Sequence, residues 1–190
     1  MVREIMKIGN PVLRETCTAV SLSDISSAGT QALIDDLIET RRVVNGAGLA
    51  APQIGVAVRI FVAENDNNPR YPYKPSIPLT VVVNPKITFL TNDQYESNEG
   101  CLSIPDLRGV VERCPEIRVA GFDRDGKVLN IVVRGVSAGT FQHEDDHLNG
   151  ILFPDRVKDT RSLSTWDEFR QRHETAFARQ VAALVERYGS

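Results

Sequence analysis

The segment His143-Glu144-Asp145-Asp146-His147 constrains this chain more than any other stretch of its sequence. Two imidazoles four residues apart lie on one face of an α-helix, where both can reach a single metal ion. The flanking sequence agrees with a helix, because residues 137–149 lead into Gly150, a typical stop signal. The pattern therefore predicts a short helix that carries a metal site.

Glu144 stands beside the two histidines and gives the motif its chemistry. Metal coordination lowers the pKa of water from about 15.7 to about 7, and a neighbouring carboxylate can then remove the proton as a general base. The same carboxylate can later protonate a leaving amine. The alternative is a polar helix face, but the chain has only 3 histidines and two of them stand at ligand spacing. A hydrolytic metal site is the better interpretation.

Two histidines do not complete a catalytic metal site, which usually has three protein ligands and one open position for water. Upstream, Cys101 stands in the segment Glu99-Gly100-Cys101-Leu102-Ser103, where the glycine allows a close approach of the backbone. Its thiolate would be a ligand for a transition metal. Taken alone, however, Cys101 is better explained as a small buried apolar side chain.

A second candidate for the third ligand lies downstream of the histidines. Glu168 follows His147 at about the spacing used by zincin-type metallopeptidases, so His143, His147 and Glu168 would make the chain an endopeptidase. His173 and Glu174 are less plausible ligands. Glu168 also has a purely structural explanation, because it is the fourth residue of a helix capping box that begins at Thr165. The residues by themselves leave both candidates open.

Apolar periodicity predicts helices near both ends of the chain and strands between them. Residues 33–44 show helical spacing that stops near Asn45-Gly46. Short β-branched or aromatic runs predict strands at residues 59–63, 79–83, 86–90, 117–122 and 128–134. Asn84-Pro85 is expected to form a turn, and Asp125-Gly126 favours a tight hairpin.

The C-terminal stretch predicts a long closing helix over about 164–188, with Phe169, Phe177 and Val181 on roughly one face. Residues 65–78, rich in Asn and Pro, are expected to form a surface loop. Strands and helices do not alternate regularly. We therefore expect an α+β fold in which mostly antiparallel sheets surround the central metal-binding helix. A chain of 190 residues is expected to be a single domain over 1–190.

Composition and charge exclude several classes of partner. The net charge is −3 and the basic residues are scattered, so the chain lacks a basic footprint for nucleic acid or an anionic membrane. We find no membrane-spanning apolar run and, in residues 1–10, no apolar core of an export signal. Its 3 cysteines have irregular spacing, which argues against a disulfide framework. We therefore expect a cytoplasmic protein.

Three sequence blocks together resemble the signature motifs of the bacterial-type peptide deformylase family. They are residues 46–53 (GAGLAAPQ), 99–103 (EGCLS) and 142–148 (QHEDDHL). Their order and separations are similar to those of the family, and residues 9–13 (GNPVL) fit its usual opening. The resemblance covers about 5–156 and fades in the C-terminal helix. Ala47 departs from the pattern, because the family more often has a branched aliphatic residue there.

The resemblance implies an enzyme that hydrolyses the N-terminal formyl group of formyl-methionyl nascent polypeptides and releases formate. It also implies one divalent metal ion, with Fe²⁺ in the cell and Zn²⁺, Ni²⁺ or Co²⁺ as substitutes. The positions that match the metal ligands of the family are Cys101, His143 and His147. Glu144 matches the general base.

The resemblance assigns further residues to the substrate. Gln53 and the backbone N–H of Leu102 match the groups that hold the oxyanion of the tetrahedral intermediate, although Gln53 has a second explanation as a loop-anchoring amide. The backbone of a glycine-containing loop would pair with an extended peptide, as in strand addition. The implied contacts are Ala47, Gly48 and Gly100.

Other residues are expected at the edge of the site. Arg108 is expected near the mouth of the pocket. Glu99 and Asp146 are expected to orient a ligand or to hold the loop against a cation such as Arg113. The amphipathic C-terminal helix is a candidate contact with the ribosome.

A third hypothesis for the function is a metal-stabilised protein that binds N-terminal peptides without turnover, and the intact Glu144 argues against it.

Overall fold

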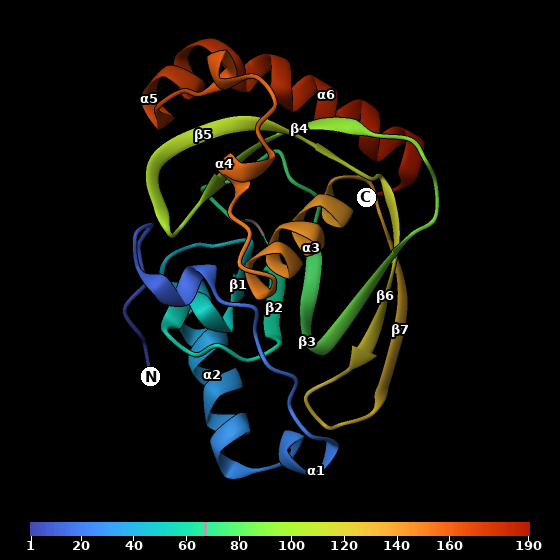
Figure 1. Ribbon diagram of the computed structural model, residues 1–190. Helices are drawn as coiled ribbons and strands as arrows, with labels where there is room; N and C mark the ends of the chain where they lie inside the picture. Colours follow the sequence, from blue (N-terminus) through green and yellow to red (C-terminus); the bar gives the residue numbers. More distant parts are fainter. Residues whose placement is uncertain (67) are drawn as a thin grey trace.

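The computed structural model describes residues 1–66 and 68–190 and confirms the expected α+β fold with antiparallel sheets (Figure 1). The larger sheet has five strands in the order β1-β2-β3-β6-β7, and a separate sheet pairs β4 with β5. The larger sheet consists of β1 (Gly48–Ala50), β2 (Ile60–Asn65), β3 (Ile77–Phe89), β6 (Glu116–Phe122) and β7 (Val128–Arg134). The smaller one consists of β4 (Tyr95–Cys101) and β5 (Ile104–Arg113).

Helices precede, follow and cross these sheets. They are α1 (Leu22–Ile25), α2 (Ala28–Val43), α3 (Gly135–Leu148), α4 (Phe153–Arg156), α5 (Trp166–Glu168) and α6 (Glu174–Tyr188). Short 3-10 turns span Pro11–Arg14, Ala51–Ile54 and Thr160–Ser162, and a π-helical segment spans Phe169–His173. No helix in residues 1–66 or 68–190 is long and apolar enough to cross a membrane.

Two helices cover opposite faces of the five-stranded sheet. Successive side chains of a strand point to opposite faces of the sheet, so side chains of β2 can pack against both helices. Val62 joins the cluster that contains Leu37 of α2, whereas Phe61 packs edge to face on Phe141 of α3, with 5.7 Å between the ring centroids. In Figure 1, α3 lies at the centre of the molecule between this sheet and the β4–β5 pair. The predicted metal-binding helix is therefore a core element.

Glycines with positive φ define both ends of α3. Gly135 has φ of 56° and donates its N–H to the Pro115 carbonyl at 2.7 Å. Gly150 has φ of 70°, and a Cβ there would lie 2.6 Å from the Arg14 carbonyl oxygen. The predicted helix and its stop signal are confirmed. The hairpin at Asp125-Gly126 is confirmed as well, since it joins β6 to β7 with Gly126 at φ of 77°.

The expected turn at Asn84-Pro85 was wrong. Residues 79–83 and 86–89 belong to one strand, β3, and the register with β6 shifts between Val83 and Lys86. Asn84 has φ of 52°, and its side chain accepts from the N–H of Val20 at 2.9 Å and donates to the Val20 carbonyl at 2.7 Å. Held in this way, Asn84 and Pro85 form a bulge that bends the strand without reversing it.

The β4–β5 pair was not predicted, because its inward-facing positions are partly polar. In β4 the alternation of buried side chains includes Ser97 and Glu99 as well as Tyr95 and Cys101. A polar residue at an inward position hides the usual apolar alternation of a strand. The two sheets thus differ in kind: one has an apolar core, and the other brings polar groups inward.

The loop and the C-terminal helix also differ from expectation. Asn65 and residues 77–78 belong to strands, Asn67 lies outside the described residues, and Tyr71 is buried against Trp166 instead of being exposed. The closing helix is divided into α5, the π-helical segment and α6.

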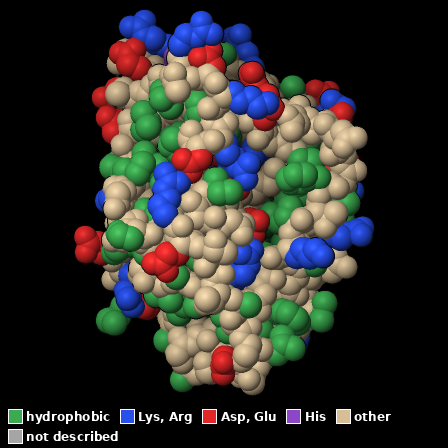
Figure 2. Space-filling model, viewed as in Figure 1, with side chains coloured by type: hydrophobic (Ala, Val, Ile, Leu, Met, Phe, Trp, Pro, Cys, Tyr) green, Lys and Arg blue, Asp and Glu red, His purple; other side chains and the backbone are tan. Residues whose placement is uncertain are grey.

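On the face drawn in Figure 2, acidic and basic side chains are interspersed.

Replacing Phe141 by alanine should lower the free energy of unfolding by about 3–5 kcal/mol, because the ring is buried between α3 and β2. Val128→Ala is the control, since Val128 is 80% exposed and its loss should change stability by less than about 0.5 kcal/mol. Denaturant titration measures both values. A loss below about 1 kcal/mol for Phe141→Ala would show that α3 does not pack as described.

Candidate metal centre

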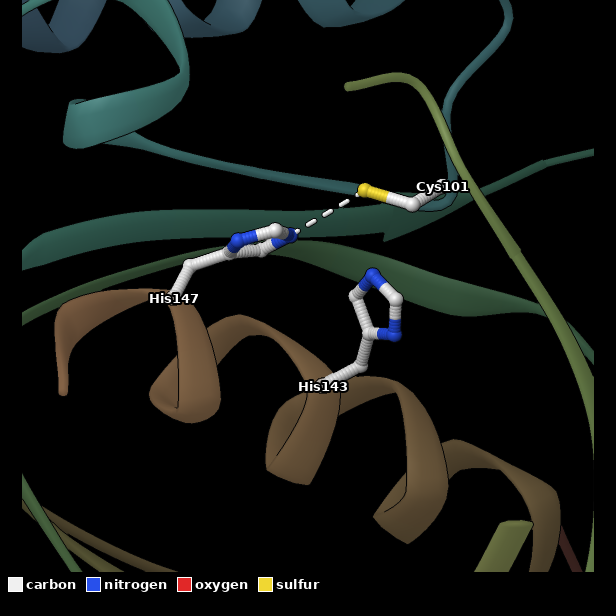
Figure 3. A group of neighbouring side chains, drawn as sticks. All are labelled: Cys101, His143 and His147. Atoms are coloured by element: carbon white, nitrogen blue, oxygen red, sulfur yellow. Dashed lines mark hydrogen bonds between the residues drawn. The ribbon is translucent and has the colours of Figure 1, made fainter. Parts of the chain in front are cut away.

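Cys101, His143 and His147 converge at the centre of the molecule (Figure 3). Their candidate ligand atoms all lie within 4.8 Å of one another. The Sγ of Cys101 is 3.3 Å from Nε2 of His147, and the two imidazole centroids are 5.0 Å apart. The histidines come from successive turns of α3, and the cysteine comes from the end of β4. The fold thus supplies three donors from two elements.

This donor set fits a divalent transition-metal ion. Thiolate and imidazole are the ligands that such ions take in proteins. Burial opposes ionisation of Cys101, but the nearby charges of His147 and His143 hold the pKa of the thiol well below its ordinary value. Burial also works against a charged His143, yet hydrogen bonds with Cys101 and Glu99 raise its pKa well above the ordinary value. The cluster therefore favours a thiolate facing a positive charge.

A buried ionic network holds His143 from behind. Oε2 of Glu99 lies 2.8 Å from Nδ1 of His143, which turns the other ring nitrogen toward the cluster. Arg113 donates to both oxygens of Glu99, at 2.8 and 2.9 Å, and to Asp146 at 2.7 Å. Burial opposes ionisation of Glu99, but Arg113 holds the pKa of that carboxyl far below its usual range. The expected pairing of Glu99 and Asp146 with Arg113 is confirmed.

Glu144 is the one acidic side chain of the predicted site that has an unpaired oxygen. It is buried, and its Oε2 makes no hydrogen bond with a residue that the structure describes. Burial raises the pKa of the carboxyl to about 7. A Cβ on Gly48 would lie 2.3 Å from Oε1 of Glu144, so only glycine leaves room for this carboxylate.

The two ends of the Gln53 amide have different partners. Its Oε1 accepts from the N–H of Ala50 at 2.9 Å, which anchors the loop. Its Nε2 donates to Sγ of Cys101 at 3.5 Å and to Oγ of Ser103 at 3.2 Å. One end of the amide is therefore fixed by the backbone, and the other faces the cluster.

An N-terminal segment that no sequence motif predicts holds the two loops that contain Gln53 and Leu102. Met6 and Ile8 donate their N–H groups to the carbonyls of Gln53 and Ser103, both at 2.8 Å. Between them, Nζ of Lys7 donates to the carbonyl of Leu102 at 2.9 Å. Gln53 and Leu102, to which the resemblance assigns the oxyanion, are thus tied to one N-terminal segment. The hydrogen bonds join residues far apart in the chain, so no local pattern reveals them.

Arg108 lies in the wall of the pocket and not at its mouth, which corrects the expectation. Its side chain is 1% exposed. Nε and Nη2 donate to the side chain and carbonyl of Asn98 at 2.7 and 2.6 Å. The guanidinium lies 4.2 Å from the ring centre of Trp166 and 4.1 Å from that of Phe169. The C-terminal segment covers this arginine, and sequence spacing could not reveal that cover.

The same pocket contains residues that the sequence did not single out. Besides the predicted residues, its lining includes Tyr71, Lys74, Ser97 and Thr140. Tyr71 and Lys74 come from the loop between β2 and β3. Ala47, Gly48 and Gly100 also line the pocket.

The alternative with Glu168 as third ligand is not favoured. Glu168 is exposed, and its carboxylate forms an ion pair with Arg172 on the next helical turn. The backbone N–H of Glu168 donates to Oγ1 of Thr165 at 3.3 Å, so Thr165 is the N-cap. In the described residues, the group of side chains able to hold a metal consists of Cys101, His143 and His147.

Comparison with known proteins gives consistent matches over most of the chain. A family model described as polypeptide deformylase matches residues 2–162. Peptide deformylase 1 of Prochlorococcus marinus is 44% identical over 190 residues, which are 100% of this chain and 93% of that protein. Peptide deformylase of Leptospira biflexa is 45% identical over 161 residues, or 84% and 90% of the two chains. The similarity thus extends beyond residues 5–156 to the C-terminal helix.

Solved structures match in the same region. A crystal structure of class I type b peptide deformylase from Acinetobacter baumannii, bound to Met-Ala-Ser, has a TM-score of 0.79 and 37% identity, and covers 83% of this chain and 99% of that one. Peptide deformylase from Thermotoga maritima has a TM-score of 0.72 and 33% identity, and covers 84% and 99%.

Gly48→Ala should lower the free energy of unfolding by about 1–3 kcal/mol, because the new methyl group would displace the buried carboxylate of Glu144. Gly29→Ala is a matched control. A Cβ at Gly29 meets nothing within 4 Å, so helix propensity should make that variant neutral or more stable by up to about 1 kcal/mol. Denaturant titration compares the two, and equal stabilities would contradict the close approach at Gly48.

The pH dependence of stability should report the raised pKa of Glu144. Between its ordinary pKa of 4.5 and about 7, the unfolded chain releases this proton while the folded chain keeps it. The stability of metal-stripped protein therefore falls as pH rises through this window. Glu144→Gln should be more stable than the parent at pH 8, by up to about 3 kcal/mol, and the difference should shrink toward pH 5. Urea titrations at both values test this, and a pH-independent difference would refute it.

Proposed function

Because the chain belongs to the polypeptide deformylase family, it is a hydrolase that removes N-terminal formyl groups from peptides, and we propose how its own residues do so. One observation carries the proposal. The donors of Cys101, His143 and His147 meet at a pocket that also contains the unpaired carboxylate of Glu144. A metal site beside a buried base is the arrangement that hydrolysis of an amide requires.

Cys101, His143 and His147 would hold one divalent metal ion, in keeping with the metal dependence of the family. When bound, the ion supplies positive charge that acidifies water and polarises a carbonyl. We propose Fe²⁺ as the ion in the cell, with Zn²⁺, Ni²⁺ or Co²⁺ able to replace it. A thiolate with two imidazoles accommodates each of these ions, so metal availability contributes to the choice.

Glu144 would act as the general base and then as the general acid. It takes a proton from the attacking water, and it delivers that proton to the peptide nitrogen as the C–N bond breaks. The products are formate and a free N-terminal amine. A carboxyl whose pKa lies at about 7 is suited to both transfers, because near neutral pH it can accept a proton and also give it up.

The oxyanion that forms on the formyl carbon would be held by Nε2 of Gln53 and the N–H of Leu102. The position of Gln53 supports this role, because Nε2 lies 3.5 Å from Sγ of Cys101 and Oε1 is fixed by the backbone of Ala50. Donors that are held in place before the reaction cost no reorganisation when the charge develops. Each donor can lower the activation free energy by about 3 kcal/mol.

The substrate peptide would add as a strand beside β1. Among the residues that the structure describes, this strand is the last of its sheet, so a peptide can pair along its outer edge. We propose that the backbone of Ala47, Gly48 and Gly100 contacts the peptide and that Arg108 forms part of the pocket wall. The small side chain of Ala47 widens the pocket at this edge.

We further propose formyl-methionyl nascent chains as the substrate in the cell, the cytoplasm as the location and one catalytic domain over 1–190. The C-terminal segment is the proposed ribosome contact. Lys and Arg side chains stand at the top of the molecule, where α5 and α6 lie (Figure 2). Arg170, Arg172 and Arg179 are exposed there, Arg170 and Arg172 as partners of Asp167 and Glu168, and exposed cations favour an anionic partner.

Formate release from formyl-Met-Ala-Ser by anaerobic, Fe²⁺-loaded protein tests the proposal. Cys101→Ala should lower kcat/KM more than about 100-fold and reduce the bound metal, because one ligand is lost. Glu168→Ala should stay within about twofold of the parent, since Glu168 is exposed and is not one of the three clustered side chains. Fully metallated parent protein that releases no formate would refute the mechanism, and full activity of Cys101→Ala would refute the third ligand.

A further inference from the structure

Arg41 is a buried cation on the last turn of α2 that binds the backbone of the loop after this helix. Its side chain is 7% exposed. Nη1 donates to the carbonyl of Gly46 and to the carbonyl of Glu64, both at 2.8 Å. Nη2 forms an ion pair with the carboxylate of Glu64. One guanidinium therefore joins the helix, the turn that follows it and strand β2.

The carboxylate of Glu64 balances the charge of this guanidinium. It also accepts from Nε and Nη2 of Arg42, at 3.0 and 2.9 Å. These hydrogen bonds from Arg42 outweigh burial and hold the pKa of the Glu64 carboxyl below its ordinary value. Arg42 is 54% exposed, and within residues 1–66 and 68–190 its guanidinium binds Glu64 but not Gly46. The two arginines thus share an acidic partner, and of the two only Arg41 holds the loop.

Asn68 holds the same carbonyl from the β2–β3 loop. Its Nδ2 donates to the carbonyl of Gly46 at 3.3 Å and to that of Asn45 at 3.0 Å. Its Oδ1 accepts from the N–H of Arg70 at 2.9 Å, which fixes the amide. Asn45 has φ of 52°, and the N–H of Gly46 donates to the carbonyl of Arg41 at 3.0 Å. The turn between α2 and β1 is therefore bound at two successive carbonyls.

This turn leads into the backbone that lines the pocket of the candidate metal centre. Gly46, Ala47 and Gly48 all contribute to its lining. Arg41 is not among the described residues of that lining and stands instead in the wall of a separate cleft. A Cβ at Gly46 would lie 3.0 Å from Cδ1 of Leu102 and 3.4 Å from Cγ of Arg41, so this backbone is also closely packed. Arg41 therefore reaches the pocket through the backbone of Gly46.

We propose that Arg41 is a positioning residue for the peptide substrate: it fixes the carbonyl of Gly46 and with it the course of residues 47 and 48. The inference rests on the proposed function, because that function places the peptide beside β1. A charged donor holds a carbonyl more firmly than a neutral amide does. An edge that is already ordered costs less when the peptide binds. Arg41 therefore determines peptide affinity and leaves the cleavage of the C–N bond unchanged.

The test compares Arg41→Met with Arg42→Met in the Fe²⁺-loaded protein, with formyl-Met-Ala-Ser as the substrate. Both variants remove one cation from Glu64, but only Arg41→Met also releases the carbonyl of Gly46. Arg41→Met should raise KM about tenfold and leave kcat within about twofold of the parent. Arg42→Met should keep both constants within about twofold. A fall in kcat at unchanged KM, or equal effects of the two variants, would overturn the proposal.

Asn68→Ala tests the same carbonyl without a change of charge. It should raise KM about threefold at unchanged kcat, because a neutral hydrogen bond is weaker than a charged one. This variant decides the question if Arg41→Met does not fold. In that case, an unchanged KM in Asn68→Ala would count against the anchoring of Gly46 and overturn the proposal.

A binding measurement separates this proposal from the proposed catalysis. Titration calorimetry with the product peptide Met-Ala-Ser gives a dissociation constant without turnover, and this constant should rise about tenfold in Arg41→Met but not in Arg42→Met. Formate release by all three proteins with equal dissociation constants would overturn only the role of Arg41. Absent formate release from the parent, together with binding that depends on Arg41, would overturn the proposed function and uphold the positioning role.

Discussion

The buried bonds of Arg113 to Glu99 and Asp146 are the interaction on which the site depends. Glu99 belongs to β4, Arg113 to β5 and Asp146 to α3, so one guanidinium joins the smaller sheet to the central helix. Cys101 lies two residues after Glu99 on the same face of β4, and it therefore reaches the helix wherever Glu99 does. Removing one partner of a buried ion pair typically lowers the free energy of unfolding by about 3–5 kcal/mol. The structure therefore favours the one arrangement of β4, β5 and α3 in which all three partners meet.

The burial of α3 explains both the rigidity and the chemistry of the centre. An apolar side chain such as Phe141 fixes the helix against the large sheet, and the polar residues of the same helix face the smaller sheet. Glu144 is thereby held in a medium that raises its pKa to about 7. The neighbouring glycine at position 48 supplies the space that its carboxylate needs. Packing and acid–base chemistry therefore have the same structural origin.

The C-terminal segment is part of the pocket and does more than close the fold. Trp166 and Phe169 stack on Arg108, and Tyr71 of the β2–β3 loop packs on Trp166. Aromatic rings keep the guanidinium out of water, while one of its nitrogens makes no hydrogen bond with a residue that the structure describes. Together with Lys74, this gives the wall of the pocket a polar and cationic character that the metal ligands do not share.

The sequence by itself determined what depends on neighbours along the chain: the helix that aligns His143 with His147, its stop at Gly150, and the hairpin at Asp125-Gly126. It left the third ligand open until the resemblance selected Cys101, because α3 and β4 come together only in the folded chain. Tertiary structure alone decided that Asn84 forms a bulge, that Arg108 is buried and that Lys74 enters the pocket. Each of these outcomes depends on contacts between residues distant in sequence, and local propensity does not contain that information.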